Sequence, residues 1–340
     1  SFQNNNLANA VNSLLTSIGS EVSVQNEVTS AADATASTAD VLFMNFAEGE
    51  RGTTDAPIVF DDSGRDEGRA YFFEGDEGVV ARFNTVERVI VGTNGDDNFT
   101  VEGDRNTTVD GGAGNDTITA SGGDDSITGG AGDDSISAGA GNDSIYGGAG
   151  ADEAVFAGNA ADYTIEQNGG LITVTHNETG EVNEVVNVET LTFDDGSQAV
   201  EVSSNVQALT TLYKQLFSFN DARDQNGAGQ ADLEGLQYWN DRAEEGTSLG
   251  QIALSMLNSD EAGNKLAALD LGTTEGVSAA IDLLYTDVLG RAEIDTEGRD
   301  YWVNQVVEEG VSLEVVADAF VASEELQDQN VQASDWDFLI

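Results

Sequence analysis

The sequence predicts a mixed, multidomain fold: a parallel β-roll with β caps, followed by an all-α domain built from two similar helical units. Residues 111–155 form five consecutive nine-residue repeats, short apolar strands flank them on both sides, and a helical pattern occurs twice after residue 205. We therefore expect six parts: an arm at 1–55, a β cap at 56–91, the β-roll at 92–155, a β-hairpin cap at 156–204, a helical domain at 205–326 and a tail at 327–340.

The repeats follow the pattern G-G-x-G-x-D-x-U-x, in which U is a large apolar residue. They read GGAGNDTIT, ASGGDDSIT, GGAGDDSIS, AGAGNDSIY and GGAGADEAV, and an earlier copy, GTNGDDNFT, starts at Gly92. Glycine permits positive φ and a close approach of backbones, while the apolar residue centres a three-residue strand. Two repeats then make one coil of turn, strand, turn and strand. Turns on the same edge are eighteen residues apart, in coils that stack at about 4.8 Å.

This stacking places the aspartates of the sixth place in two columns. Asp97, Asp116, Asp134 and Asp152 lie on one edge, and Asp125 and Asp143 lie on the other. Carboxylates stacked at this spacing repel one another unless a cation lies between them. Carboxylate and carbonyl oxygens favour calcium over magnesium or zinc, and we expect about four or five Ca²⁺ ions. The predicted ligands are the six aspartates and the turn glycines Gly111, Gly114, Gly129, Gly132 and Gly147.

These repeats resemble the RTX nonapeptide, the calcium-binding repeat of secreted bacterial proteins. The resemblance implies a β-roll that folds when it binds calcium. Residues 188–196, VETLTFDDG, resemble the segment that often closes an RTX block. Residues 334–340, SDWDFLI, are similar to an uncleaved type I secretion signal, which implies the type I secretion machinery as a partner and an extracellular or cell-surface location. An ordinary apolar tail docked on the preceding domain is the alternative for residues 334–340.

Composition excludes several classes of function. The formal net charge is −51, which argues against binding to nucleic acid or to an anionic membrane surface. The absence of cysteine excludes disulfides and thiolate metal sites. No apolar stretch approaches the roughly 20 residues of a membrane span.

The segments on either side of the repeats predict further strands. In the arm, Leu7, Val11, Leu14, Leu15, Ile18 and Val22 have helical spacing, and residues 41–46 read as a strand. The arm either packs on residues 56–200 or waits for a partner molecule; it is either a partly ordered leader or an arm exchanged between subunits. Strands are expected at 57–60, 69–73, 79–83 and 86–91. An antiparallel set is expected at 163–166, 171–175, 182–188 and 190–193.

The helical domain contains an internal repeat. Tyr238-Trp239 recurs as Tyr301-Trp302, and Ser248 and Ser312 occupy matching places where each can cap a helix. The region resembles a domain of unknown function that often accompanies RTX blocks in bacterial surface proteins. The aromatic pairs recur in phase with the helices, which favours core packing over a sugar-binding platform. Residues 221–232, DARDQNGAGQAD, form either a loose calcium loop or a polar surface loop.

The sequence does not predict an enzyme. His176 is the single histidine, whereas an H-E-x-x-H zinc protease needs two, and the chain contains neither a G-x-S-x-G elbow nor cysteine.

We therefore expect a secreted calcium-binding structural protein that folds outside the cell and assembles with itself into an extracellular filament, surface layer or biofilm matrix. The alternatives are a monomeric adhesin that binds glycan or a cell surface, and a small secreted toxin or bacteriocin based on residues 7–22.

Overall fold

The computed structural model describes residues 23–62, 68–84, 88–168, 171–200, 233–259, 262–291 and 294–323, together with 202, 205, 206, 208, 209, 212, 216 and 326. The chain divides into two compact units, and residues 23–200 and 233–323 account for most of what is described in each. The predicted helix at residues 7–22, the loop at 221–232 and the tail at 327–340 lie outside the described residues.

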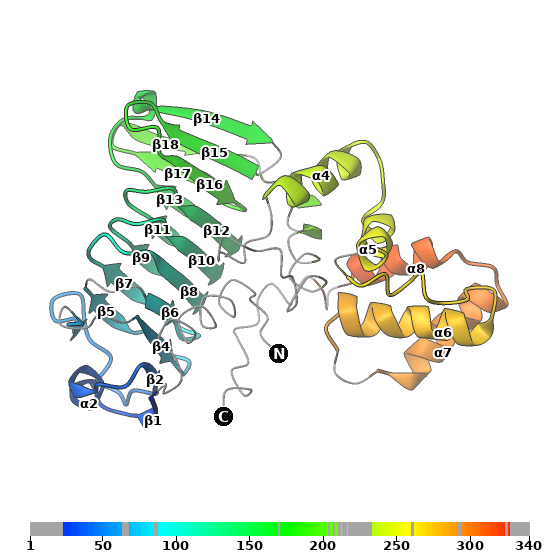
Figure 1. Cartoon of the computed structure of the whole chain (residues 1–340), viewed down its shortest axis with the longest axis horizontal. Helices are drawn as coiled ribbons and strands as arrows, with labels where there is room; N and C mark the ends of the chain where they lie inside the picture. Colours follow the sequence, from blue (N-terminus) through cyan, green and yellow to red (C-terminus); the bar gives the residue numbers. More distant parts are fainter. Residues whose placement is uncertain are drawn as a thin grey trace. The chain divides into compact units, whose positions relative to one another are not determined.

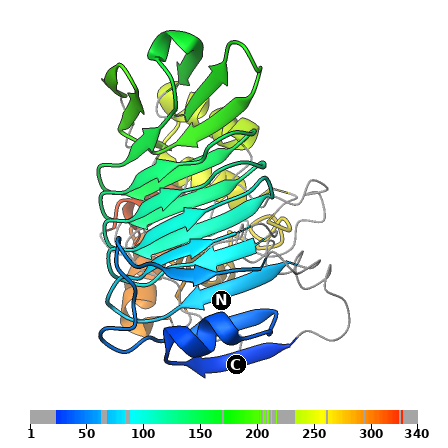
Figure 2. The ribbon, with the colours of Figure 1, turned by 90° about the vertical axis from the view of Figure 1, so that its left-hand side faces the viewer.

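The first unit is a parallel β-solenoid of about six turns over residues 24–154, in which two sheets face each other across a single core (Figures 1 and 2). The ten-stranded sheet contains, in spatial order, β1 (Val24–Val28), β2 (Val41–Met44), β4 (Arg69–Phe73), β6 (Arg88–Val91), β8 (Thr107–Ala113), β10 (Ser126–Ala131), β12 (Ser144–Ala149), β16 (Val182–Val186), β15 (Leu171–His176) and β14 (Tyr163–Asn168). The eight-stranded sheet contains β18 (Gly196–Ala199), β17 (Thr190–Phe193), β13 (Glu153–Val155), β11 (Ser135–Ser137), β9 (Thr117–Thr119), β7 (Asn98–Val101), β5 (Val80–Phe83) and β3 (Ile58–Phe60).

The register of the sheets confirms the eighteen-residue coil. Ile118 pairs in parallel with Ile136 in one sheet, and Ile127 pairs with Ile145 in the other. These isoleucine side chains are buried, with at most 2% of their surface exposed. Identical side chains therefore stack along the core, because each coil repeats the path of the coil before it.

The parallel ladder begins well before the first glycine-rich repeat. Strands β3 to β6 belong to the same two sheets as the repeats, although the sequence predicts a cap in this region. Strand β2 pairs in parallel with β4 and is buried along its whole length. The predicted strand of the arm thus packs on the solenoid of its own chain, which is the first of the two alternatives above. The short helix α2 (Ala31–Ala36), capped by Ser30, contacts β1 and β3.

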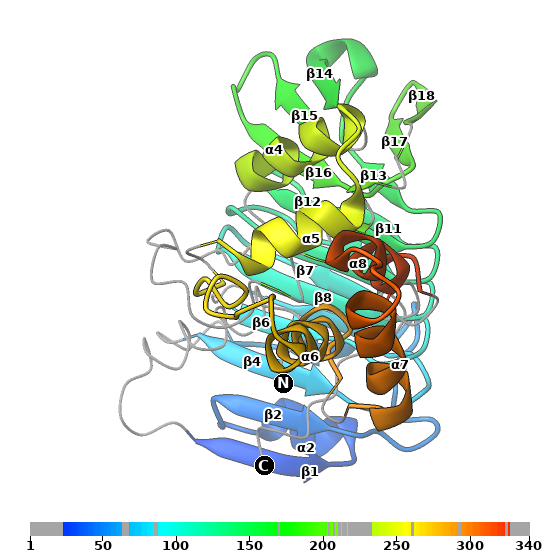
Figure 3. The ribbon, with the colours of Figure 1, turned by 90° about the vertical axis from the view of Figure 1, so that its right-hand side faces the viewer.

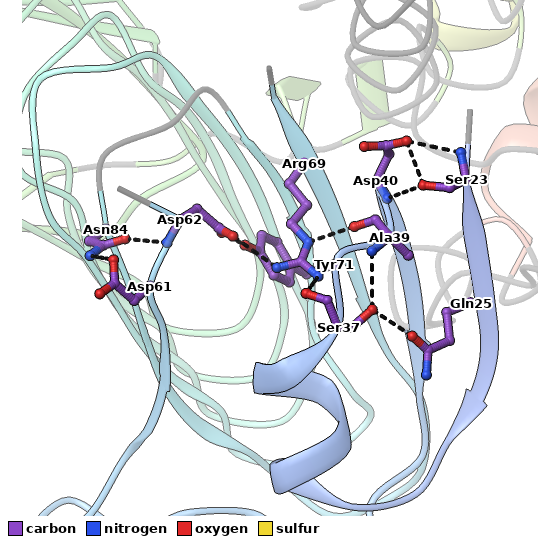
Figure 4. A network of polar contacts seen from close by, with 10 residues as sticks. All are labelled: Ser23, Gln25, Ser37, Ala39, Asp40, Asp61, Asp62, Arg69, Tyr71 and Asn84. Carbon is purple, nitrogen blue, oxygen red and sulfur yellow. Dashed lines mark hydrogen bonds and ion pairs between the residues drawn. The ribbon is translucent and has the colours of Figure 1, made fainter. Parts of the chain in front are cut away.

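Aromatic side chains fill the core of these early coils, where isoleucine fills it later. The rings of Phe60 and Phe83 stack at 5.2 Å, and those of Phe73 and Phe99 at 5.5 Å. A buried ion pair accompanies them: Arg69 Nη1 donates to Asp62 Oδ1 at 2.8 Å, and Tyr71 donates to the other oxygen of Asp62 (Figure 4). The early coils therefore carry a charge pair supplied by the chain itself.

The other end of the solenoid becomes antiparallel, as predicted. The 3₁₀ turn η1 (Ala160–Asp162) leads into the antiparallel pairs of β14 with β15 and β15 with β16, while β17 pairs with β18. Strands β16 and β17 still pair in parallel with β12 and β13. The expected hairpin cap therefore starts with one more coil of the solenoid.

The second unit is helical (Figure 3). Its elements are α4 (Leu233–Glu244), α5 (Leu249–Leu257), α6 (Thr274–Leu283), the π-helical turn η2 (Leu284–Val288), α7 (Thr296–Val307) and α8 (Leu313–Val321). Helices α5 and α8, which occupy matching places in the sequence repeat, pack against each other, and α6 packs against α7. Ser248 and Ser312 accept hydrogen bonds from Gln251 N and Val315 N, so both predicted helix caps are confirmed. Among the described helices, none has the length and apolar character needed to cross a bilayer.

Candidate metal centre

The sixth-place aspartates lie where a turn enters a strand, with their side chains directed into the turn. All six are buried, with 1–2% of their surface exposed. Glycines with positive φ shape the turns: Gly112 has a φ of 101° and Gly114 a φ of 107°. Added side chains at Gly114 and Gly132 would strike the backbone of the preceding coil. Glycine at these positions therefore allows the coils to stack closely.

One edge of the solenoid holds the turns at 92–97, 111–116, 129–134 and 147–152, which we call the glycine edge. Here Asp97 Oδ1 accepts a hydrogen bond from Val79 N, and each later aspartate accepts one through Oδ1 from the backbone N–H of the aspartate one coil earlier. The N···Oδ1 distances are 2.7 Å for Asp97 to Asp116, 2.7 Å for Asp116 to Asp134 and 2.9 Å for Asp134 to Asp152. Glu189 Oε2 continues the column by accepting from Asp152 N at 2.7 Å.

The opposite edge holds the turns at 102–107, 120–125 and 138–143, which we call the alanine edge because Ala120 and Ala138 stand in the first place of its two well-formed repeats. Asp125 Oδ1 accepts from Thr107 N at 2.7 Å, and Asp143 Oδ1 accepts from Asp125 N at 2.9 Å. The two predicted columns of aspartates are therefore confirmed as structural stacks.

The second carboxylate oxygen is the feature that points to a cation. Among the described residues, no group donates a hydrogen bond to this buried Oδ2 atom in five aspartates, which we call the open aspartates: Asp116, Asp125, Asp134, Asp143 and Asp152. Leaving a buried charged oxygen without any partner is costly. The carboxylates are therefore arranged for a ligand that supplies positive charge.

Backbone oxygens converge beside three of the open aspartates. A Cβ added at Gly111 would overlap both Asp116 Oδ2 and the carbonyl oxygen of Gly129. The same holds at Gly129 for Asp134 and the Gly147 carbonyl, and at Gly147 for Asp152 and the carbonyl of Asn187. The absence of a side chain at each of these glycines thus allows one carboxylate oxygen and one carbonyl oxygen to lie close to its Cα.

Asp97 differs from the open aspartates. Its Oδ2 accepts from Thr93 N at 2.6 Å and lies 3.1 Å from the Thr93 hydroxyl. Thr93 stands where later turns of the glycine edge have a second glycine. Both oxygens of Asp97 therefore accept hydrogen bonds from the protein. Among the six predicted aspartate ligands, Asp97 is the one whose structure least requires a cation.

An exposed ladder at the fifth place of the repeats provides a contrast. On the glycine edge, Asp96 Oδ1 accepts from Asn115 N and Asn115 Oδ1 accepts from Asp133 N, at 2.8 and 2.9 Å. On the alanine edge, Asn106 is followed by Asp124 and then Asn142. Aspartate and asparagine thus alternate in the exposed ladder, so carboxylates never stack on one another there. The buried columns keep adjacent carboxylates, as expected where a cation separates them.

Burial also makes the charged form of the six aspartates unfavourable without a cation. Burial raises their pKa above the usual 3.8, with further increases from neighbouring carboxylates in most cases and opposing backbone hydrogen bonds. The pKa values rise to about 7 for Asp97, 9 for Asp116, 8 for Asp125, 7 for Asp134, 6 for Asp143 and 7 for Asp152.

These oxygens fit calcium better than a metal that requires nitrogen or sulfur ligands. Within the described ranges, no three histidine, cysteine or carboxylate side chains gather around one point. The ligands therefore have to be single carboxylates together with backbone carbonyls, which is the oxygen-rich set that calcium accepts. Gly111, Gly129 and Gly147 lie beside the open aspartates, whereas Gly114 and Gly132 lie at contacts between coils. That these residues bind calcium, and how many ions they bind, remain predictions.

The aromatic pairs of the helical unit are only partly packed. Tyr238 and Tyr301 are 47% and 56% exposed, so the prediction of core packing is wrong for them, while Trp239 and Trp302 are half-buried. The guanidinium of Arg242 lies 3.4 Å from the ring centre of Tyr238. His176 is half-buried against Tyr163.

The comparisons with known proteins agree with the two-unit organisation. The family model of the RTX calcium-binding nonapeptide repeat (4 copies) matches residues 101–136 and 119–154. The model named Domain of unknown function (DUF4214) matches residues 273–330. No curated protein and no solved structure matches the chain. The chain thus carries a block of RTX calcium-binding repeats, folded as a parallel β-solenoid, and a DUF4214 domain in its helical part.

Proposed function

We propose that this chain is a secreted bacterial structural protein that folds outside the cell when it binds calcium and then assembles with itself. The observation that carries the proposal is the set of five open aspartates, buried and stacked without a hydrogen-bond donor at Oδ2. Bound calcium would supply the positively charged partner that these carboxylate oxygens lack. The chain supplies the glycine turns that orient the carboxylate and carbonyl oxygens and keep water away from them.

Export before folding is consistent with the charge of the protein. At a net charge of −51, the calcium-free chain repels itself. Burying the ionised aspartates of the columns without a cation also costs free energy of folding. Extracellular calcium modules bind with dissociation constants of about 10⁻⁴ to 10⁻³ M, far above the affinity of cytosolic sensors. The chain would therefore stay unfolded inside the cell, in a form that the type I secretion machinery can thread, and fold after release.

The ends of the solenoid support self-assembly. In the described sheets, β1 and β3 are the last strands at one end, and β14 and β18 are the last at the other. Such edge strands can pair with another chain. A contact between unlike ends is head-to-tail and forms open fibres unless it closes into a ring. We therefore propose calcium-dependent filaments, or layers made from them, as the material of a surface layer or biofilm matrix.

Negative-stain electron microscopy tests this function. The full chain would be imaged in millimolar calcium, in the same concentration of magnesium and in a chelator. Filaments or sheets in calcium alone are expected. Compact single particles in calcium would contradict assembly and favour the adhesin, and identical images in all three conditions would contradict control by calcium.

A monomeric adhesin is the second candidate, because of the exposed tyrosines of the helical unit. Tyr238 and Tyr301 each contact a half-buried tryptophan edge-to-face, at ring distances of 4.9 and 5.1 Å. Exposed aromatic rings of this kind can stack on sugars. A glycan array would identify a ligand, and the Trp239→Ala and Trp302→Ala variants would then lose binding.

A further inference from the structure

The two edges of the solenoid have different chemistry along their columns. On the glycine edge, five carboxylates follow one another without interruption, ending at Glu189: Asp97, Asp116, Asp134, Asp152 and Glu189. On the alanine edge, the column contains only two carboxylates, Asp125 and Asp143. The neighbouring places are neutral, because Thr107 precedes Asp125 and Asn183 Oδ1 accepts from Asp143 N at 3.1 Å.

Two buried charges outside the columns increase this difference. Asp110, which is 9% exposed, adds negative charge near Asp116 and Asp134. The alanine edge instead has Arg88, whose side chain is 1% exposed and whose strand pairs in register with Thr107. Burial lowers the pKa of Arg88 to about 10, while Asp62 and Asp125 raise it, so the guanidinium stays protonated at neutral pH. The chain therefore supplies a buried cation of its own toward Asp125.

The residue in the first place of the repeat also differs between the two edges, and this difference again favours cation binding on the glycine edge. Beside Asp134 this place is Gly129, whose missing side chain lets Asp134 Oδ2 and the Gly147 carbonyl oxygen lie close to its Cα. Five residues before Asp143 the corresponding residue is Ala138, which is buried with 3% of its surface exposed. Its methyl group occupies the place into which, on the glycine edge, the carboxylate oxygen and the carbonyl oxygen reach.

We propose that the two edges bind calcium unequally. The glycine edge, at Asp116, Asp134 and Asp152, takes up calcium at the lower concentration, and the alanine edge, at Asp125 and Asp143, takes it up at a higher concentration. Calcium affinity depends on the number of charged ligands and on the fit of the cavity, and both favour the glycine edge. The proposal rests on calcium binding by the RTX block but not on assembly into filaments.

A matched pair of substitutions tests the proposal, one on each edge. Asp134→Asn and Asp125→Asn each remove one buried charge and keep an oxygen that can accept the hydrogen bond between coils. Calcium titrations would be followed by far-ultraviolet circular dichroism, and bound ions would be counted by native mass spectrometry. Asp133→Asn is the control, because Asp133 is the exposed neighbour of Asp134.

Wild type should bind calcium in two steps. Asp134→Asn should move the first step to a calcium concentration higher by about tenfold or more, while Asp125→Asn should leave that step in place and weaken only the second. Asp133→Asn should resemble wild type. Equal shifts of the first step in the Asp134 and Asp125 variants would overturn the proposal, although calcium binding would stand. A wild-type chain that binds no calcium would instead contradict the proposed function.

A substitution that is expected to strengthen calcium binding distinguishes an effect on the site from a loss of folding, because misfolding would weaken binding. Ala138→Gly removes the methyl group on the alanine edge, and we expect it to move the second step to a lower calcium concentration. An unchanged or weakened second step in a folded Ala138→Gly variant would refute the role assigned to the methyl group.

Discussion

Acid should partly replace calcium in folding the solenoid, because a proton can neutralise the same buried carboxylates. The perturbation is to lower the pH of the calcium-free protein from about 8.5 to about 4, close to the usual aspartate pKa of 3.8. The folded-state pKa values of the six aspartates are raised above the unfolded value of 3.8, so the folded chain binds protons more tightly than the unfolded chain. The calcium-free fold is then most stable below the unfolded pKa and loses stability as pH rises through about 6 to 9.

The magnitude follows from the sizes of these shifts. Asp143, which shifts least, moves from 3.8 to about 6, and each unit corresponds to about 1.4 kcal/mol. Six aspartates shifted by two units or more would cost on the order of 15 kcal/mol when all are charged. This cost equals or exceeds the roughly 5–15 kcal/mol by which native proteins are stable. The calcium-free solenoid should therefore be unfolded at alkaline pH and regain β-structure in mild acid.

Far-ultraviolet circular dichroism in a chelator, recorded across this pH range, measures the effect. The control variant replaces the five open aspartates with asparagine, and it should keep its β-structure at every pH and without calcium. A calcium-free wild type with the same β-structure at both ends of the range, or with more of it at alkaline pH, would show that protons on the buried aspartates do not stabilise the fold. A control variant that follows the wild-type pH profile would assign the effect to the net charge of the chain instead.

Three further substitutions and one control test the core packing, the buried ion pair and a helix cap. Ile136→Ala empties a fully buried core position and should cost about 2–5 kcal/mol in urea unfolding with calcium present, while Ser137→Ala, half-buried on the same strand, should change stability by less than about 0.5 kcal/mol. Asp62→Ala leaves the buried guanidinium of Arg69 without its carboxylate and should cost about 3–5 kcal/mol in the same assay. Ser248→Ala removes a helix cap and should lower the stability of the helical unit by about 1 kcal/mol, with the same loss in calcium and in chelator; a loss confined to chelator would contradict independent folding of that unit.

Much of the fold could be predicted because the solenoid repeats its sequence. A large apolar residue at every ninth position identifies both sheets and their register, and the strand at residues 69–73 is predicted at its observed bounds. The earlier coils were less predictable, since aromatic residues such as Phe60 and Phe83 fill the core there without a glycine repeat. Helix α2 was missed, because its core contacts are made by two alanines, Ala31 and Ala34, in a polar stretch.

The candidate metal site was likewise predictable in part. Spacing alone predicted which aspartates stack, and the hydrogen bonds between coils confirm it. Spacing could not show that Thr93 donates hydrogen bonds to Asp97, because these bonds depend on the directions of the Thr93 hydroxyl and N–H in the folded turn. The buried position of Arg88 near Asp125 was equally hidden, since the two residues are distant in sequence and meet only after the coils stack.

The repeat, its eighteen-residue coil, the two acidic columns and the duplicated helical unit can all be recognised from the order of the residues alone. These features follow from periodicity, which a linear chain records directly. The folded structure was needed to locate the start of the parallel ladder, the carboxylate oxygens that lack a donor and the differences between the two edges in charge and in the residue beside each aspartate. Those properties arise from side chains that become neighbours only when one coil lies on the next, so no local pattern contains them.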